Sequence, residues 1–444
     1  MWGYKLRANR FGRDTDRLVA QALEREHWSE GEWKEWQGRR LQSVLDRASR
    51  TVPFYSNQWV TRDEANSDDL QSWPILEKEP LRADPHSFLS NDCDPARMIH
   101  EHTSGTTGKA IELWYSRETA RSWYALIEAR WRGWYGVSRQ DRWAHIGGQL
   151  VTPVHQRNPP FWVWNAALNQ LYMSAYHLAP DLIPHYLDAL RKHRITYLCG
   201  YTSALYSLAR VAVDSGVHDL AMKVAVTDAE PLDAYQRDAI SQAFQCPVRE
   251  TYGMSEMVAA ASECEHGRMH LWPEAGIMEL VEEDRVVPAG GVGEVVCTGL
   301  LNSDMPLIRY RLGDRAALAP KHTVCPCGRR LPILSCIEGR TDDVLFTRDG
   351  RQIGRLDPVF KANLPVREAQ IIQESLLEIR VIYSPAPGFS ESDAQSIIDR
   401  LHTRMGDVRV ILEPVDEIPR SANGKFRAVM CRIPPSERAQ IGIH

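Results

Sequence analysis

A short segment rich in Ser, Thr and Gly, "HTSGTTGKA" at residues 102–110, has the residue types that bind phosphate. Glycine lets backbone N–H groups approach an anion closely, the hydroxyls add donors, and Lys109 adds a compact positive charge. A Walker A loop needs four residues between its first Gly and the Gly-Lys pair, followed by Ser or Thr. Here only Thr106 and Thr107 intervene, and Ala110 follows. By itself, the segment is as typical of a polar turn between two strands as of a phosphate-binding loop.

Four later segments carry further charged and polar groups in a definite order along the chain. They are "ETYGMSE" at 250–256, "RYRLGD" at 309–314, "EGRTDD" at 338–343 and "IPRSANGKFR" at 418–427. Each charged residue in them could be a solvated carboxylate, a turn former or a surface cation. Together with the first segment they make five motifs in one order, a combination not expected of an unrelated chain.

The elements that must position these motifs alternate between strand-like and helix-like patterns from about residue 95 to 335. "ITYLCGY" at 195–201 is typical of a buried strand, and "TSALYSLARVAVDSG" after it is typical of a helix. This alternation predicts parallel strands joined by crossover helices, and such sheets bind ligands at the carboxyl ends of their strands. Around 260–335 the pattern changes to short strands with Gly turns, which predicts a mostly β subdomain.

The predicted fold class is α/β. Residues 1 to about 90 favour helices, and the last hundred residues favour a separate α+β unit. At ~150 residues per domain, 444 residues allow about three units. We therefore expect a large N-terminal α/β domain with several subdomains over 1–340, and a small α+β C-terminal domain over 341–444.

Composition excludes several classes of partner. The net charge of -5, with 25% charged residues, gives no basic excess for nucleic acid. No apolar run is long enough to span a membrane, and the N-terminal residues lack the apolar core of a secretory signal. Nine cysteines, an odd number, indicate reduced thiols. We expect a cytoplasmic protein with neither a nucleic-acid nor a membrane partner, either a monomer or a homodimer.

Read in order, the five motifs resemble the adenylate-forming superfamily of acyl-CoA synthetases, adenylation domains and luciferases. "VLDRASRTVPFY", "WPILEKEPLR" and "DAEPLDAYQRDAISQAFQCPV" resemble the phenylacetate-CoA ligase family more narrowly. The resemblance covers nearly the whole chain. It implies ATP-dependent activation of a carboxylic acid, aromatic in that family, to acyl-AMP with release of pyrophosphate. Transfer of the acyl group to coenzyme A would follow.

Other acceptors and other classes stay open at this stage. A carrier protein or an amine could replace coenzyme A as the acceptor. The chain could also be a nucleotide-binding relative without ligase activity, although the expected charged residues are all present. A P-loop phosphotransferase is disfavoured because Ala110 stands where that motif needs Ser or Thr.

The resemblance also implies a role for each motif. Lys109 and its loop would cover the β- and γ-phosphates, and Glu256 would hold Mg²⁺, which prefers oxygen ligands. Lys425 would stabilise charge on the attacking carboxylate and the α-phosphate. Asp342 would be the hinge about which the small domain turns. The implied nucleotide contacts are Ser104, Gly105, Thr106, Thr107, Gly108, Ala229, Glu230, Tyr252, Gly253, Ser255, Asp314 and Arg340.

Several positions depart from the pattern of these relatives: "GKA" replaces the commoner "GKP", the loop "FTRDGRQI" looks one residue longer, and a third lies before "AEP". Asp228 stands where they usually have Gly before "AEP", which adds a carboxylate near the expected adenine edge. None of the expected catalytic groups is lost by this change. The role of Asp228 stays open.

The variable middle of the large domain should supply the acyl pocket. Aromatic side chains there could form a flat slot for an aryl ring, or could equally be ordinary core. The candidates are His145, Gly147, Trp162, Trp164, Tyr172 and Tyr201.

Two Cys- and His-containing segments bracket the predicted β subdomain. "ECEHGRMH" and "TVCPCGRR" supply thiolate and imidazole groups, which zinc binds in a closed tetrahedron. Some phenylacetate-CoA ligase relatives look similar here. We expect Cys264, His270, Cys325 and Cys327 to hold a structural Zn²⁺; free thiols and a surface histidine are the alternative, since Cys-x-Cys is a tight spacing.

Overall fold

The structure is a computed structural model of the 444-residue chain. It describes residues 2–58, 70–71, 73–102, 111–149, 151–153, 156–178, 181–288, 290–320, 322–340, 345–348, 352–353, 359, 364–419, 427–434 and 437. The chain divides into two compact units, Met1–Leu312 with Ala316–Cys336, and Gly313–Arg315 with Ile337–His444. The boundaries fall within two strands, and each unit is described by itself below.

The first unit begins with helices. The longest, α3 (Glu30–Thr51), starts with a capping box in which Ser29 and Glu32 bond each other's backbone N–H groups, and it ends before Pro53. Its inward face buries apolar side chains at helical spacing: Trp33, Leu41, Val44, Leu45 and Ala48. The other helices are α1 (Trp2–Arg10), α2 (Thr15–Arg25), α4 (Pro53–Gln58), α5 (Lys78–Ala83), η2 (Pro85–Phe88) and η3 (Pro95–Arg97).

A two-stranded ladder flanks the predicted phosphate loop. Strands β1 (Ile99–His102) and β2 (Glu112–Tyr115) are antiparallel, with His102 opposite Glu112. The chain then continues through α6 (Arg117–Ile127), the π-helix η4 (Glu128–Arg132) and η5 (Gly133–Tyr135).

The centre of the first unit is a run of parallel strands. From one edge inward these are β5, β3, β6, β7 and β8, with β4 antiparallel to β5 at the edge. Their bounds are β3 (Trp143–Gly147), β4 (Trp162–Asn165), β5 (Gln170–Ser174), β6 (Tyr197–Tyr201), β7 (Ala225–Asp228) and β8 (Val248–Gly253). The connecting helices are η6 (Ala175–His177), α7 (Ile183–His193), α8 (Thr202–Asp214) and α9 (Ala234–Phe244).

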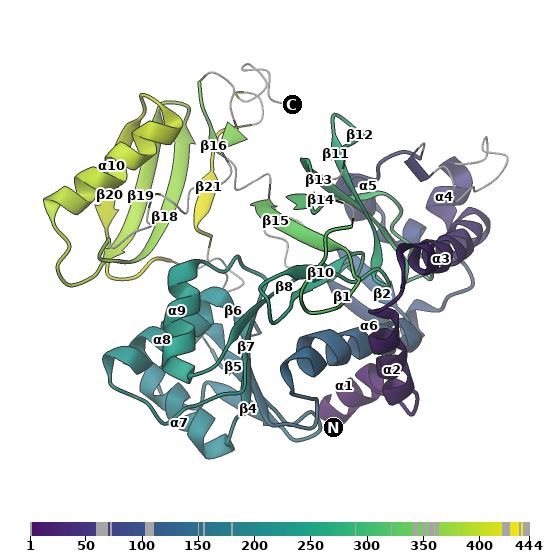
Figure 1. Ribbon diagram of the computed structural model, residues 1–444, viewed down its shortest axis with the longest axis horizontal. Coiled ribbons are helices and arrows are strands. Elements are labelled where there is room, and N and C mark those ends of the chain that lie inside the picture. The colour runs from purple at the N-terminus through teal and green to yellow at the C-terminus, as the bar shows by residue number, and fades with distance from the viewer. Residues whose placement is uncertain are drawn as a thin grey trace. The chain divides into compact units, whose positions relative to one another are not determined.

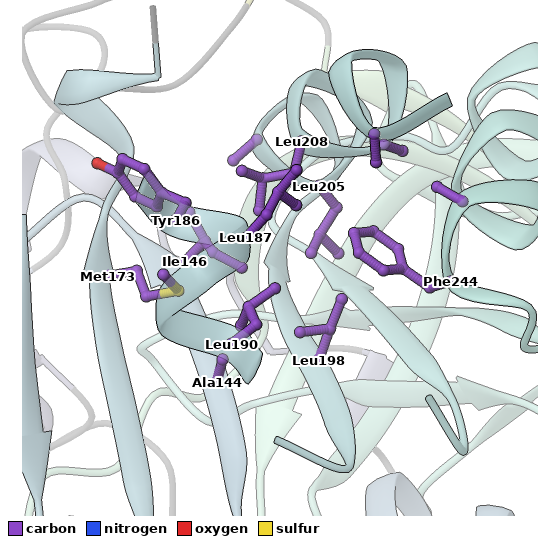
Figure 2. Close-up of a cluster of buried hydrophobic side chains, with 14 of the residues drawn as sticks. Ala144, Ile146, Met173, Tyr186, Leu187, Leu190, Leu198, Leu205, Leu208 and Phe244 are labelled. Carbon is purple, nitrogen blue, oxygen red and sulfur yellow. The ribbon is translucent and has the colours of Figure 1, made fainter. Parts of the chain in front are cut away.

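Helices cover both faces of these strands (Figure 1). On one face α7, α8 and α9 bury a core that includes Ile146, Met173 and Phe244 (Figure 2). On the other face Trp143 and Tyr197 stack in parallel, and the Arg132 guanidinium of η4 lies 4.9 Å from the Trp143 ring. The predicted α/β class with crossover helices is therefore confirmed.

The sheet continues past β8 with short strands, as the sequence pattern after residue 260 indicates, and the pairs β8–β9, β9–β10, β10–β15, β11–β13 and β11–β12 are antiparallel. The order of the full thirteen-stranded sheet is β12-β11-β13-β14-β15-β10-β9-β8-β7-β6-β3-β5-β4. The added strands are β9 (Ala260–Glu263), β10 (Met269–Leu271), β11 (Gly276–Glu282), β12 (Arg285–Val286), β13 (Val292–Gly299), β14 (Tyr310–Leu318) and β15 (Ile333–Arg340). Among the helices that the structure describes, none is long and apolar enough to cross a membrane.

The second unit has its own sheet and core. The order of its four strands is β20-β19-β18-β21, and α10 (Glu391–Met405) packs on them through Ile397 and Leu401. The strands are β18 (Val366–Ser375), β19 (Glu378–Pro385), β20 (Arg409–Pro414) and β21 (Val429–Cys431). Two short strands of the same region, β16 (Leu345–Phe346) and β17 (Gln352–Ile353), pair in antiparallel fashion.

Candidate functional site

The groups predicted to act on the phosphates and the reacting carboxylate lie outside the described residues. This holds for Ser104, Gly105, Thr106, Thr107, Gly108, Lys109, Asp342 and Lys425. The loop carrying the first six is bounded by β1 and β2, which bring its two ends side by side.

The end of β8 carries the motif predicted to hold the metal ion. Tyr252 is half-buried, whereas Gly253 and Ser255 are exposed just beyond the sheet edge. Glu256 follows in a tight turn, where the fully buried Tyr310 donates a hydrogen bond of 3.2 Å to its Oε1. That bond orients the carboxylate, and its oxygens are the donor type Mg²⁺ prefers. The motif "RYRLGD" is singled out for Asp314, and its sequence gives no sign that Tyr310 would bond to Glu256.

A sharp turn follows β7 at "DAEP". Ala229 has φ of 60°, and the Glu230 N–H donates to the Asp228 carbonyl at 2.8 Å. The Glu230 carboxylate accepts from the Ser203 N–H at 2.8 Å and the Ser203 hydroxyl at 3.1 Å, at the start of α8. Glu230 therefore fixes the turn to a helix N-terminus, where negative charge is favourable.

The predicted ribose ligands are carried by β14 and β15. Asp314 is half-buried and follows Gly313, whose φ of 81° is one that glycine adopts without strain. It shares β14 with Tyr310, the partner of Glu256. Arg340 ends β15, and its side chain lies outside what the structure describes.

The predicted acyl-site residues are divided between two faces of the sheet. Side chains directly opposite on neighbouring strands share a face. His145 is opposite Tyr172 on β5, and Tyr201 of β6 is on the same face. Trp162 and Trp164 of β4 are opposite Met173 and Leu171, which belong to the core under α7.

The two tryptophans thus belong to the helix-covered core. The Trp162 ring contacts Tyr186 edge-on, and the Trp164 ring stacks on His193 at 5.1 Å. Both partners are in α7. The predicted slot of four aromatic rings is therefore corrected, because the alternation of side chains along β4 places its tryptophans on the opposite face of the sheet from Tyr172.

His145, Gly147, Tyr172 and Tyr201 remain together at the carboxyl edge of the parallel strands. Burial, aided by the charges of Arg10 and Arg132, lowers the pKa of His145 to about 4, so its imidazole is neutral at physiological pH. Burial also raises the pKa of Tyr201 to about 12, and the charge of Asp228 contributes to this shift. His145, Tyr172 and Tyr201 present neutral polar side chains near the "DAEP" turn.

Cys264, His270, Cys325 and Cys327 converge as predicted. Their ligand atoms all lie within 4.8 Å of one another; the Cys264 and Cys325 sulfurs are 3.6 Å apart, and Cys327 Sγ is 3.4 Å from His270 Nε2. Zn–S bonds of about 2.3 Å in a tetrahedron would separate sulfurs by about 3.8 Å. His270 Nδ1 is 3.2 Å from the Leu331 carbonyl, so Nδ1 carries the proton and Nε2 faces the sulfur.

A buried charge network surrounds this cluster. Arg329, just after Cys327, pairs with Glu26 at 3.2 Å, and its guanidinium lies 4.2 Å from the Trp134 ring. The Trp134 ring meets His270 edge-on at 6.0 Å. These contacts connect the cluster to the N-terminal helices, since Glu26 directly follows α2.

Comparison with known proteins identifies the family. The family model described as AMP-binding enzyme matches residues 39–303, and the one described as CapK C-terminal domain matches 345–432. The chain belongs to the AMP-binding enzyme family, as its motifs predict. Protein CapK of Staphylococcus aureus is 25% identical over 406 residues, covering 88% of each chain. Phenylacetate-coenzyme A ligase of Thermus thermophilus is 26% identical and covers 89% of this chain and 95% of its own.

A solved structure agrees with this assignment at the level of the fold. The 2-hydroxyisobutyryl-CoA ligase, crystallised in the postadenylation state with R3-HIB-AMP, has a TM-score of 0.71. Its sequence is 20% identical, and the match covers 94% of this chain and 93% of that one.

Proposed function

We propose that this protein is an AMP-forming acid–thiol ligase. It activates a carboxylic acid with ATP to acyl-AMP, releasing pyrophosphate, and then transfers the acyl group to coenzyme A. The observation that carries the proposal is the hydrogen bond from Tyr310 to Glu256, which joins the predicted metal-binding motif to the strand of the predicted ribose ligand Asp314. Two motifs far apart in sequence are thus in direct contact, in a chain of the AMP-binding family, and this contact supports the proposal.

The chain's own residues hold ATP for in-line attack on the α-phosphorus. Lys109 and the hydroxyls and N–H groups of residues 104–108 bind the β- and γ-phosphates. Tyr252, Gly253, Ser255 and the "DAEP" turn at 228–231 line the nucleotide, with Ala229 and Glu230 at the adenine side. Asp314 accepts from the ribose hydroxyls, and Arg340 adds a second contact. Glu256 would hold Mg²⁺, and the ion when bound would neutralise charge on the phosphate oxygens.

The second unit supplies the group nearest the reacting carboxylate. Lys425 stabilises the negative charge shared by the carboxylate and the α-phosphate during adenylation. The small domain then turns about Asp342, so that Lys425 withdraws before the thiol attacks the acyl carbonyl and AMP leaves. Coenzyme A is the acceptor we favour over a carrier protein or an amine, because the ligase relatives and the solved neighbour are named as coenzyme A ligases.

Acid-dependent exchange of labelled pyrophosphate into ATP tests this proposal. The assay is run with a panel of aromatic and aliphatic acids, and a positive acid is then tested with coenzyme A, hydroxylamine or an amine. We expect exchange with at least one acid and a thioester with coenzyme A. Exchange without any thioester would favour another acceptor, and a panel without exchange would contradict the proposed activity.

We also propose that Cys264, His270, Cys325 and Cys327 hold a structural Zn²⁺. Three thiols and an imidazole are the donor set zinc prefers, and their separations match a closed tetrahedral site. Cys264 is fully buried and Cys325 nearly so, and four protein ligands leave no position for substrate. The ion would fix the hairpin loop that contains Arg329 to strands β9 and β10.

A further inference from the structure

Because Trp162 and Trp164 lie in the helix-covered core, the predicted acyl site is left with His145, Tyr172 and Tyr201. These side chains make it more polar than a slot for an aryl ring requires. Its side chains come from β3 and from the strands on either side of it, β5 and β6. From β3 the chain passes to β5 on one side and then, through α7, to β6 on the other side. Open α/β sheets bind their ligands outside the strand ends at such a switch point.

His145 of β3 is reachable from outside although many groups surround it. Its side chain is half-buried, whereas Trp143 and Ile146 beside it are buried. Its ring contacts Trp143 and Tyr172, and no hydrogen bond joins it to any other residue in the described part of the chain. A neutral imidazole can donate at one nitrogen and accept at the other, so this ring has hydrogen-bonding capacity for a ligand.

The Tyr172 hydroxyl and Nε2 of the His145 ring lie near each other. A Cβ built on Gly147 would stand 2.7 Å from both His145 Nε2 and Tyr172 Oη, so these two polar atoms lie close together, packed near the Gly147 Cα. Tyr172 Oη accepts the Gln149 N–H at 2.8 Å, which leaves its own proton for a second partner. A side chain at residue 147 would force the two atoms to move, so glycine permits their present arrangement.

We propose that His145 and Tyr172 select a carboxylic acid with a hydroxyl group on its acyl part. The hydroxyl can donate to the imidazole and accept from the phenol, and both partners are neutral, so it needs no counter-charge. A site that hydrogen-bonds a substrate hydroxyl discriminates strongly against the analogue without it, because its polar groups are then left unpaired. Gly147 is the residue that allows the imidazole and the phenol to lie this close together.

This inference rests on the proposed function, and the experiment separates the two. Acids that differ by one hydroxyl are compared in pyrophosphate exchange, for example phenylacetate with its three ring-hydroxylated isomers and benzoate with its own. We expect one hydroxy acid to exceed its parent by about tenfold or more in kcat/KM. Tyr172→Phe removes only the hydroxyl. It should bring the ratio of kcat/KM for the hydroxy acid to kcat/KM for the parent acid near one, mainly by lowering kcat/KM for the hydroxy acid.

His145→Phe is the second variant and should have the same effect through the other partner. Tyr235→Phe is the control, since it removes an exposed phenol from α9 and should leave the ratio unchanged. Exchange with the parent acids but no preference for a hydroxy acid would overturn this inference alone. So would a preference that survives both substitutions in variants whose unfolding is cooperative. No exchange with any acid would overturn the proposed function and this inference with it.

Discussion

The hydroxyl of Tyr310 lies 3.2 Å from Oε1 of Glu256, and the phenol ring beneath it is completely buried. Tyr310 is the first residue of β14, and Glu256 follows the end of β8. In the sheet, β15, β10 and β9 lie between these two strands. A buried tyrosine therefore orients the Glu256 carboxylate, which lies beyond the carboxyl end of β8. A ligand orienter of this kind usually matters for both metal affinity and rate.

Tyr310→Phe should weaken the response of the enzyme to Mg²⁺. The ring still fills its buried space, but Glu256 loses its orienting donor, so we expect kcat/KM for Mg-ATP to fall roughly 10-fold or more. Pyrophosphate exchange over a Mg²⁺ titration measures the change. Tyr186→Phe is a matched control, because Tyr186 is also fully buried and donates one hydrogen bond, to the Ser174 carbonyl at 2.7 Å. Equal effects of the two substitutions would contradict the role given to Tyr310.

The purified protein should contain about one zinc ion per chain. Cys325→Ser should lower the zinc content and reduce Tm by roughly 5 °C or more, because metal binding contributes to the stability of the fold around it. Elemental analysis and thermal unfolding measure both quantities. Cys93→Ser, at a half-buried thiol away from the cluster, should change neither. A zinc content below about half an ion per chain, in protein never exposed to chelator, would exclude the site.

Lys425→Ala should separate the two half-reactions. Adenylation should slow by about 100-fold or more, since the charge that Lys425 offers to the carboxylate and α-phosphate is lost. Thioester formation from preformed acyl-AMP and coenzyme A should change far less. Lys192→Ala, at an exposed lysine of α7, is the control. Wild-type exchange in Lys425→Ala would show that another group has this role.

Glu250 should lower the free energy of unfolding as the pH rises from about 4.5 to about 7. Burial, and secondly the charge of Glu263, raise its pKa from 4.5 to about 7. Between these values the folded state keeps a proton that the unfolded state has released, so the free energy of unfolding decreases through this window. Glu250→Gln should therefore be more stable than wild type at pH 8, by about 2 kcal/mol, and nearly equal at pH 4.5.

Denaturant unfolding followed by tryptophan fluorescence at both pH values measures this difference. Glu35→Gln, at an exposed carboxylate of α3, should show no such pH-dependent difference from wild type. The same gain in stability at both pH values would mean that the effect of Glu250→Gln is not electrostatic.

Much of the fold could be predicted from local pattern alone. The alternation after residue 95 is realised as β6, α8 and β7, and the capping box at Ser29 begins α3. Periodicity and capping depend on neighbours a few residues away, so they are legible in the chain. The Cys and His cluster was also predictable, because few residue types bind zinc and its four candidates occur in two short segments.

The sequence by itself determined which chemical groups are available and their order along the chain. Tertiary structure decided which of them meet. The register of β4 against β5 sent Trp162 and Trp164 to the helix-covered face, and that of β3 against β5 set His145 beside Tyr172. The bond between Tyr310 and Glu256 likewise depends on strands brought together across the sheet. A shift of one residue in a strand pairing moves every side chain of that strand to the other face, so the pairing that is realised in the folded sheet decides which groups meet.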